Sequence, residues 1–173
     1  MLLVILALHT RYKFQLGIPL DMLWACHIAT LLIAIAGLTR VYWLASIGLL
    51  FHIGMGIPAY LIDVIATGST TWTSILAHLF PAVVGLLIVK RHGYAKHNFA
   101  KTFLFVLLSQ LLAYVATPPA QNVNLVFFVW EPVAAWFSNV WLYRICNLLF
   151  ACSLLLPVHF LLRRYPPKAS DQP

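Results

Sequence analysis

Long apolar segments alternate with short polar segments along most of the chain. This pattern predicts six helical segments: residues 1–9 or slightly beyond, 17–38, 41–57, 72–89, 98–117 and 141–162. A helix needs about 20 apolar residues to cross the hydrocarbon core of a bilayer. The five later segments have roughly that length. Residues 1–9 are too few, so we expect either a shortened first span or the end of a truncated one.

Two stretches between these segments break the helical pattern. Residues 58–71 contain Pro58, Gly68 and Ser69, which argue against a continuous span, so a loop is expected there. Residues 118–139 have an apolar middle that Glu131 and Pro132 interrupt. We expect this second stretch to be interfacial or re-entrant rather than spanning.

The composition identifies the class of protein. Hydrophobic residues make up 62% of the 173 positions and charged residues only 9%, with a mean hydropathy of +0.91. So few charges cannot cover the surface of a soluble domain of this size. We therefore predict an all-α, polytopic transmembrane helical bundle, with one domain over residues 1–164 and a short polar tail over 165–173. The first residues lack a basic region and a small-residue cleavage site, so no cleaved signal peptide is expected.

The formal net charge of +7 comes from basic residues in the loops. Such residues gather on the cytoplasmic side of membrane proteins. Walking the helices alternately assigns one face Arg40, Lys90, Arg91, Lys96, Lys101, Arg163, Arg164 and Lys168, and the other face only Arg11 and Lys13. We therefore expect a multi-pass protein with both termini in the cytoplasm. Because the basic residues do not line one polar face of a helix, a nucleic-acid partner is not expected.

Polar side chains inside the apolar segments carry functional information, because they are costly in hydrocarbon. They are Asp21, Cys26, His27, His52, His78, Gln110, Arg144, Asn147 and His159. At a rise of about 1.5 Å per residue, Cys26 lies roughly 13 Å from the non-cytoplasmic start of its helix. By the same count all of these residues except His159 fall in the non-cytoplasmic half. We predict a polar pocket there.

Nucleophilic catalysis is one chemistry that such a pocket can support. A thiol becomes a good nucleophile when a histidine takes its proton, and Cys26 and His78 can form that pair across two helices. His27 is expected to be a poor partner for Cys26, because adjacent residues on a helix point about 100° apart. His52 can orient His78 or bind substrate.

A metal site and a transport path are the alternatives. Cys26 or His27, together with His52 and His78, can supply three zinc ligands. No closely spaced ligand pair supports this reading, so we favour the thiol and expect neither a metal nor a cofactor. The polar layer stops within one half of the membrane, which argues against a permeation path.

Separated signatures along the chain resemble the multispan membrane cysteine acyltransferases that remodel ether phospholipids in eukaryotes, and the related bacterial YwaF-like membrane proteins. The matching residues are Tyr12-Lys13-Phe14, Cys26-His27, His52 with Gly56, His78 followed by Lys90 to Tyr94, Asn122 with Asn124, and Pro132 followed by Trp141-Leu142-Tyr143-Arg144. The chain departs from the family pattern where Ala25 replaces a proline and Ala77 a glutamine.

The resemblance implies acyl transfer between phospholipid and lysophospholipid through a cysteine thioester, with Cys26 as nucleophile and His78 as its partner. The candidate substrate-binding residues are His27, His52, Asn124, Tyr143, Arg144 and Asn147. The expected partners are membrane phospholipids and lysophospholipids, and no protein partner is evident. With water as acceptor the same site would be a lipid hydrolase. A non-enzymatic lipid-binding or transport protein is the remaining alternative.

Overall fold

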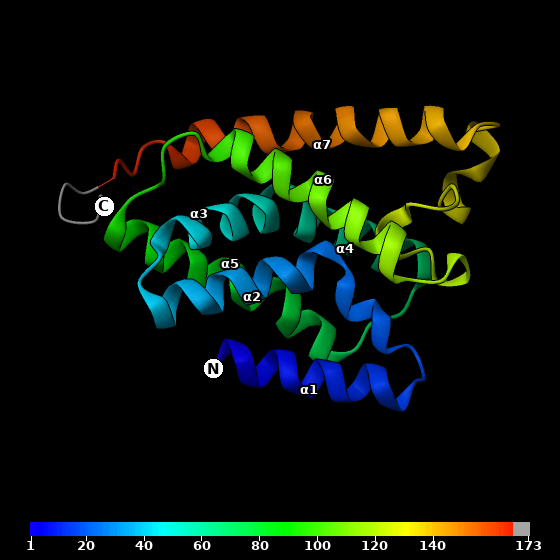
Figure 1. Cartoon of the computed structure of the whole chain (residues 1–173), viewed down its shortest axis with the longest axis horizontal. Coiled ribbons are helices and arrows are strands. Elements are labelled where there is room, and N and C mark those ends of the chain that lie inside the picture. Colours follow the sequence, from blue (N-terminus) through cyan, green and yellow to red (C-terminus); the bar gives the residue numbers. More distant parts are fainter. Residues whose placement is uncertain (168–173) are drawn as a thin grey trace.

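The chain folds as a bundle of α-helices, shown in Figure 1 as a computed structural model that describes residues 1–167. Within these residues there is no strand, and the helices are α1 (Leu2–Gln15), α2 (Ala25–Thr39), α3 (Tyr42–Phe51), α4 (Ile57–Thr67), α5 (Trp72–His92), α6 (Asn98–Ala116) and α7 (Val140–Leu162). The predicted all-α class is confirmed. Lys168 and most of the predicted tail lie outside the described residues.

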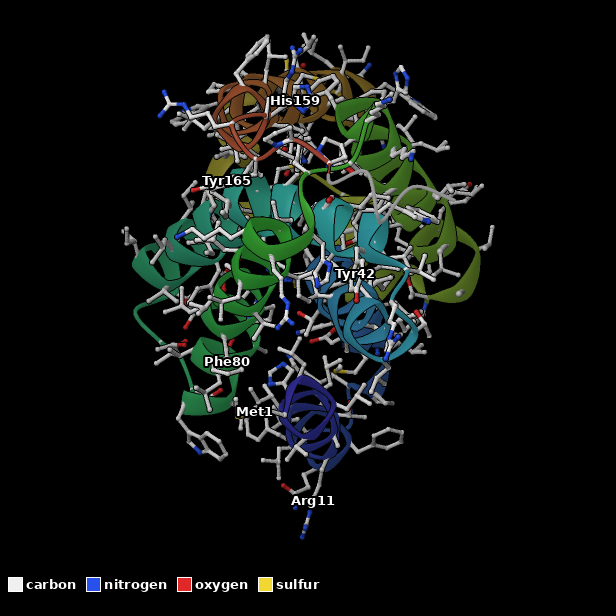
Figure 2. All side chains as sticks on the ribbon, turned by 90° about the vertical axis from the view of Figure 1, so that its left-hand side faces the viewer. Met1, Arg11, Tyr42, Phe80, His159 and Tyr165 are labelled. Carbon is white, nitrogen blue, oxygen red and sulfur yellow. The ribbon has the colours of Figure 1, made fainter. Side chains whose placement is uncertain are left out.

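The helices are stacked from α1 at one edge of the bundle to α7 at the opposite edge, as the two perpendicular views in Figures 1 and 2 show. Between these edges, α2 packs against α3 and α5, and α3 packs in turn against α5, α6 and α7. α1 contacts α5 and α2. The central helices α2, α3 and α5 therefore hold the residues with the least access to the outside.

Four helical segments have the length and apolar character to cross a membrane: Tyr42–Thr67, Trp72–His92, Asn98–Ala116 and Val140–Leu162. Helix α2 is apolar but shorter. Large apolar side chains point outward from the helices that cover the bundle, among them Leu108, Leu111, Val115, Ile145 and Leu149. An outward apolar surface of this extent is stable in lipid rather than in water. The structure thus supports a membrane protein.

Small residues let the central helices approach closely. A Cβ atom on Gly48 of α3 would lie 2.6 Å from Ile33 Cγ1 and 2.7 Å from the Ala29 carbonyl oxygen, both on α2. A Cβ on Gly85 of α5 would lie 3.2 Å from both Ile33 Cδ1 and Leu49 Cβ. Helix association in membranes depends on such close van der Waals contact. These glycines fix the spacing of the three central helices α2, α3 and α5.

The predicted continuous helix over residues 17–38 is wrong. The segment contains a 3-10 turn, Pro19–Leu23, followed by Trp24 with φ −57° and ψ 137°, and α2 begins only at Ala25. Pro19 begins the turn, and tertiary hydrogen bonds described below hold the break. Cys26 is consequently the second residue of a helix rather than a mid-helix residue.

The predicted loop over residues 58–71 is also wrong over most of its length. Helix α3 continues through a π-helical turn, His52–Gly56, into α4, and only Gly68–Thr71 separate α4 from α5. Pro58 stands in the first turn of α4, just after the π turn changes the hydrogen-bond register, where its missing N–H is tolerated. The change of register brings residues of α4 against α5.

The ends of α2, α5 and α7 meet the start of α6 at one end of the bundle, the left side of Figure 1. Ser46 of α3 ties the loop between α5 and α6 to this end: its Oγ accepts from Ala95 N at 3.1 Å, and its carbonyl accepts from Asn98 Nδ2 at 2.8 Å. Burial raises the pKa of the Tyr94 phenol to about 12. The phenol is therefore protonated near neutral pH and donates to His159 Nδ1, 2.9 Å away.

Candidate functional site

The N-terminus of α2 is held in place by a side chain almost one hundred residues away. Asn124 Oδ1 accepts from Ala25 N at 2.8 Å, while Asn124 Nδ2 donates to the carbonyls of Leu23 at 3.1 Å and Ser109 at 3.0 Å. Asn124 itself has φ +54°, a left-handed conformation that asparagine tolerates better than most residues. One amide thus satisfies both sides of the break before Cys26 and joins it to α6.

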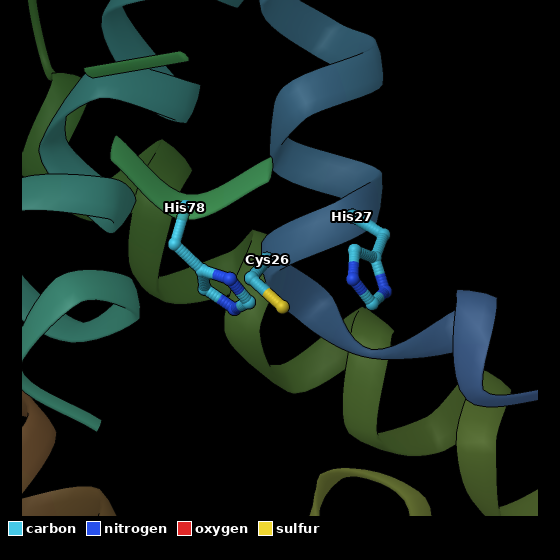
Figure 3. Close-up of side chains that lie close together, drawn as sticks. All are labelled: Cys26, His27 and His78. Atoms are coloured by element: carbon cyan, nitrogen blue, oxygen red, sulfur yellow. The ribbon is translucent and has the colours of Figure 1, made fainter. Parts of the chain in front are cut away.

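Cys26, His27 and His78 form a compact cluster in the centre of the bundle. One ligand atom from each residue (the sulfur and one nitrogen of each ring) lies within 4.8 Å of the other two. Figure 3 shows the Cys26 side chain between the two rings, with His78 reaching in from α5. The expected pair of Cys26 and His78 therefore lies together. His27, which was expected to be a poor partner for Cys26, also lies in the cluster, because its ring turns back toward the 3-10 turn that precedes α2.

Hydrogen bonds to backbone carbonyls set the protonation pattern of both histidines. His78 Nδ1 lies 2.8 Å from the Ser74 carbonyl oxygen, and His27 Nδ1 lies 3.0 Å from that of Asp21. A carbonyl oxygen only accepts, so in the neutral rings Nδ1 carries the proton and Nε2 carries a free lone pair. Nε2 of His27 is buried and has no hydrogen-bond partner among the described residues. Two histidine rings, each with its Nδ1 held by a carbonyl, thus lie beside one thiol.

His52 supports the cluster through a second hydrogen-bonded side chain. Thr30 Oγ1 donates to the Cys26 carbonyl at 2.9 Å and lies 3.0 Å from His52 Nε2. With its single proton given to a carbonyl, the Thr30 hydroxyl accepts from His52 Nε2–H. His52 is fully buried, with no exposed surface. Its contacts give it a positioning role toward the first turn of α2.

Two aromatic neighbours of the cluster escaped the sequence-based prediction. The ring of Tyr60 stacks on His78 with centroids 4.3 Å apart and planes inclined by 10°. The ring of His9 on α1 lies 4.8 Å from that of His27, and its Nδ1 is 3.2 Å from Thr73 Oγ1. Tyr60 was placed in a predicted loop and His9 at the end of a short segment. Tyr60 was missed because the sequence pattern did not reveal that the helix continues through the π turn into α4.

A polar pocket of about 160 Å³ adjoins the cluster. Its lining includes His9, Tyr60 and Ser74, which contact the clustered histidines, and Lys13. Lys13 forms an ion pair with Asp21, with Nζ and Oδ2 2.8 Å apart. The pocket therefore lies beside residues that contact His27 and His78.

Three further predicted residues, Tyr143, Arg144 and Asn147, stand on α7, and the first two contact the segment leading into that helix. The Arg144 guanidinium donates to the Val126 carbonyl and lies 4.4 Å from the centroid of the Trp141 ring. Tyr143 is buried, with its ring 5.2 Å from that of Phe137. Asn147 is half-buried one turn further on. These contacts anchor the irregular segment that carries Asn124.

Comparisons with protein-family models, with curated proteins and with solved structures give no match for this chain.

Proposed function

We propose that this chain is a membrane acyltransferase that moves a fatty acyl chain between a phospholipid and a lysophospholipid through a thioester on Cys26. The observation that carries the proposal is the cluster itself: a thiol and the ring of His78, whose Nδ1 is held by the Ser74 carbonyl, come together from two helices. Nucleophilic enzymes share this arrangement, in which a base is itself oriented by a third group. Here that third group is the Ser74 carbonyl.

The first half-reaction forms the acyl-enzyme. His78 Nε2 takes the proton of the Cys26 thiol, and the thiolate attacks the carbonyl carbon of the donor ester. The tetrahedral intermediate collapses with cleavage of the ester C–O bond. The departing lysophospholipid alkoxide takes the proton from the His78 imidazolium, leaving a thioester on Cys26 and a neutral His78.

The second half-reaction returns the enzyme to its starting state. A hydroxyl of the acceptor lysophospholipid gives its proton to His78 Nε2 and attacks the thioester carbonyl. The C–S bond breaks, and Cys26 recovers its proton from His78. Exclusion of water from the interior of the bundle favours the lipid acceptor over hydrolysis.

The position of Cys26 adds electrostatic support. The N–H groups in the first turn of a helix have no intrahelical acceptor and form the positive end of its dipole. A thiolate or an oxyanion beside Cys26 is stabilised there. Asn124 does not bind substrate in this proposal but positions the backbone before Cys26, because its amide is already hydrogen-bonded to Ala25, Leu23 and Ser109. Arg144 or Asn147 on α7 remain the proposed partners of a phospholipid headgroup.

The proposed topology places both termini in the cytoplasm and the cluster in the non-cytoplasmic half of the membrane. It rests on the seven basic residues Arg40, Lys90, Arg91, Lys96, Lys101, Arg163 and Arg164 at or next to the ends of helices that meet on one side of the bundle. Positive residues in short loops favour the cytoplasm. The resemblance to multispan cysteine acyltransferases and YwaF-like proteins supports the same assignment of Cys26 and His78.

An acyl-exchange assay tests this function. The protein is reconstituted in vesicles with a phospholipid carrying an isotope-labelled acyl chain and an unlabelled lysophospholipid, and labelled product is followed by mass spectrometry. Wild type should form labelled product, and Cys26→Ser and His78→Ala should lose at least about a hundredfold in rate. Cys146→Ser, on α7, is the matched control and should keep the wild-type rate.

Other outcomes of this assay discriminate the alternatives. Release of labelled fatty acid without transfer, lost in Cys26→Ser, would replace the transferase with a lipid hydrolase at the same site. An unchanged lipid composition with folded wild-type protein would contradict both enzymes and leave a lipid-binding or transport protein.

A further inference from the structure

The three clustered side chains present the donor set of a transition-metal site. A thiolate and two imidazole nitrogens are the ligands that zinc and similar borderline cations select, whereas magnesium and calcium prefer oxygen ligands. We propose that Cys26, His27 and His78 bind a divalent cation of the zinc class. This inference goes beyond the proposed acyl transfer, which requires only Cys26 and His78.

The orientation of both rings supports metal binding. A metal-bound histidine usually donates its other ring N–H to a carbonyl or carboxylate, which fixes the tautomer and leaves the second nitrogen free to coordinate. His27 and His78 both show this arrangement, with the Asp21 and Ser74 carbonyls as the acceptors. Each ring is thus prepared to coordinate through Nε2.

His27 provides an independent indication of a ligand. Its side chain is only 5% exposed, and its Nε2 atom is buried without a hydrogen-bond partner among the described residues. A buried polar atom without a partner costs about 1–3 kcal/mol. The acyl-transfer mechanism gives this nitrogen no role, whereas coordination of a cation satisfies it.

The distances fit after a small closure. Ligand atoms around a tetrahedral zinc ion lie about 3.4–3.6 Å apart, given bonds of about 2.0–2.3 Å. The Cys26 sulfur and one nitrogen of each ring lie within 4.8 Å of one another, so side-chain rotations that move each ligand atom by about 1 Å are enough to reach that spacing. Three protein ligands leave the fourth tetrahedral position for water or a substrate group.

Binding of the cation has a defined proton balance and a defined consequence. Cys26 gives its proton to solvent as the metal–sulfur bond forms, while His27 and His78 bind as neutral rings. The metal then occupies the sulfur and the nitrogen that the proposed acyl transfer uses. Metal binding and acylation of Cys26 should exclude each other, a consequence that rests on the proposed function.

Cobalt(II) spectroscopy tests the site without lipid or activity. Chelator-treated protein in detergent is titrated with cobalt(II), which gives visible d–d bands in a tetrahedral site and a near-ultraviolet charge-transfer band when bound to a thiolate. Wild type should show both with one equivalent, and one equivalent of zinc should remove them. Cys26→Ser should lose the charge-transfer band, and His27→Gln and His78→Gln should each weaken binding by at least about tenfold.

Matched controls lie elsewhere in the bundle. Cys146→Ser removes a thiol on α7, and His159→Gln removes a histidine bound to Tyr94; both should bind cobalt as wild type does. A charge-transfer band that persists in Cys26→Ser, or wild-type protein that is folded yet shows no tetrahedral band, would overturn the proposal. If wild-type protein shows neither cobalt band but still exchanges acyl chains, the metal site is rejected and the enzyme proposal stands.

A measurement on wild type alone covers the case in which the variants fail to fold. Zinc should slow maleimide labelling of Cys26 by at least about tenfold, while labelling of Cys146 is unchanged. The two sites are read separately by peptide mass spectrometry. Equal labelling of Cys26 with and without zinc would refute the site.

Discussion

The side chain of Asn124 connects three backbone segments that are far apart in the sequence. It holds the first amide of α2, the carbonyl of Leu23 and the carbonyl of Ser109. A cap that satisfies one helix terminus contributes about 1 kcal/mol. Asn124 satisfies groups on both sides of a break, and its loss leaves several of them without a partner.

Asn124→Ala should therefore lower the free energy of unfolding by about 2–4 kcal/mol. Asn139→Ala is the matched control, because the Asn139 side chain caps a single helix start by accepting from Trp141 N of α7, and its loss should cost about 1 kcal/mol. Denaturation in detergent, followed by circular dichroism, compares the two. Equal losses would mean that the cap before Cys26 has no special structural role.

Thr30 is the second residue whose side chain holds the backbone next to the Cys26 thiol. Thr30→Val keeps the shape of the side chain but removes the hydroxyl between His52 and the Cys26 carbonyl. The His52 ring and the carbonyls of Cys26 and Ala77 lose this hydrogen-bond partner, so stability should fall by about 1–3 kcal/mol. Thr30→Ser retains the hydroxyl and loses one methyl group, at about 1 kcal/mol. A Val variant as stable as the Ser variant would contradict the chain from His52 to Cys26.

At the scale of the helices, apolar length was enough to predict α5, α6 and α7 from sequence. The predicted segments 72–89, 98–117 and 141–162 agree with the structure to within three residues at each end. The two wrong predictions, the helix over 17–38 and the loop over 58–71, concern places where the local sequence pattern does not decide the backbone conformation. Asn124 stabilises a helix start at Ala25 from a distant loop, and a π turn carries the helix past Pro58.

The candidate site was likewise predicted only in part from the sequence. Sequence reasoning paired Cys26 with His78 because it assigned both residues to the same half of the membrane and because the family resemblance pairs them, although the helix start used to count the depth of Cys26 was wrong. It named His27 as a candidate substrate-binding residue but a poor partner for Cys26, because it assumed an unbroken helix around Cys26. It missed Tyr60 because it assumed a loop after Pro58. Which side chains meet across helices depends on helix rotation, which apolar periodicity does not fix in a chain that is apolar on most sides.

Helix spacing can be tested with a pair of glycines. Gly48→Ala places a methyl group 2.6 Å from Ile33 Cγ1 and 2.7 Å from a backbone oxygen, so α2 and α3 must separate, at about 1–3 kcal/mol. On α2 itself, Gly37→Ala meets no heavy atom closer than 4.0 Å and should be neutral or stabilising by up to about 1 kcal/mol. Thermal unfolding of both variants in detergent measures the difference, and a Gly48→Ala protein as stable as wild type would contradict the close approach.

For the whole molecule, the distribution of basic residues predicts which face of the membrane each loop occupies. Lys96→Cys lies in the loop between α5 and α6, and Ser69→Cys in the loop between α4 and α5. In a background with Cys26, Cys146 and Cys152 replaced by serine, an impermeant maleimide added to intact cells should label Ser69→Cys and not Lys96→Cys. Lysis should expose Lys96→Cys. The reverse pattern would invert the proposed topology.

The central claim is that Cys26 carries the acyl chain, and intact-mass spectrometry tests it most directly. Purified protein is incubated with a phospholipid carrying a labelled acyl chain, quenched in acid and weighed, and the adduct is mapped to a peptide. Wild type should gain one labelled acyl group on Cys26 that hydroxylamine removes, as a thioester requires. Cys26→Ser should gain no such adduct, and His78→Ala should gain it at least about a hundredfold more slowly. Folded wild-type protein that exchanges acyl chains between lipids without any adduct, or with an adduct on Cys146 or Cys152, would contradict the claim.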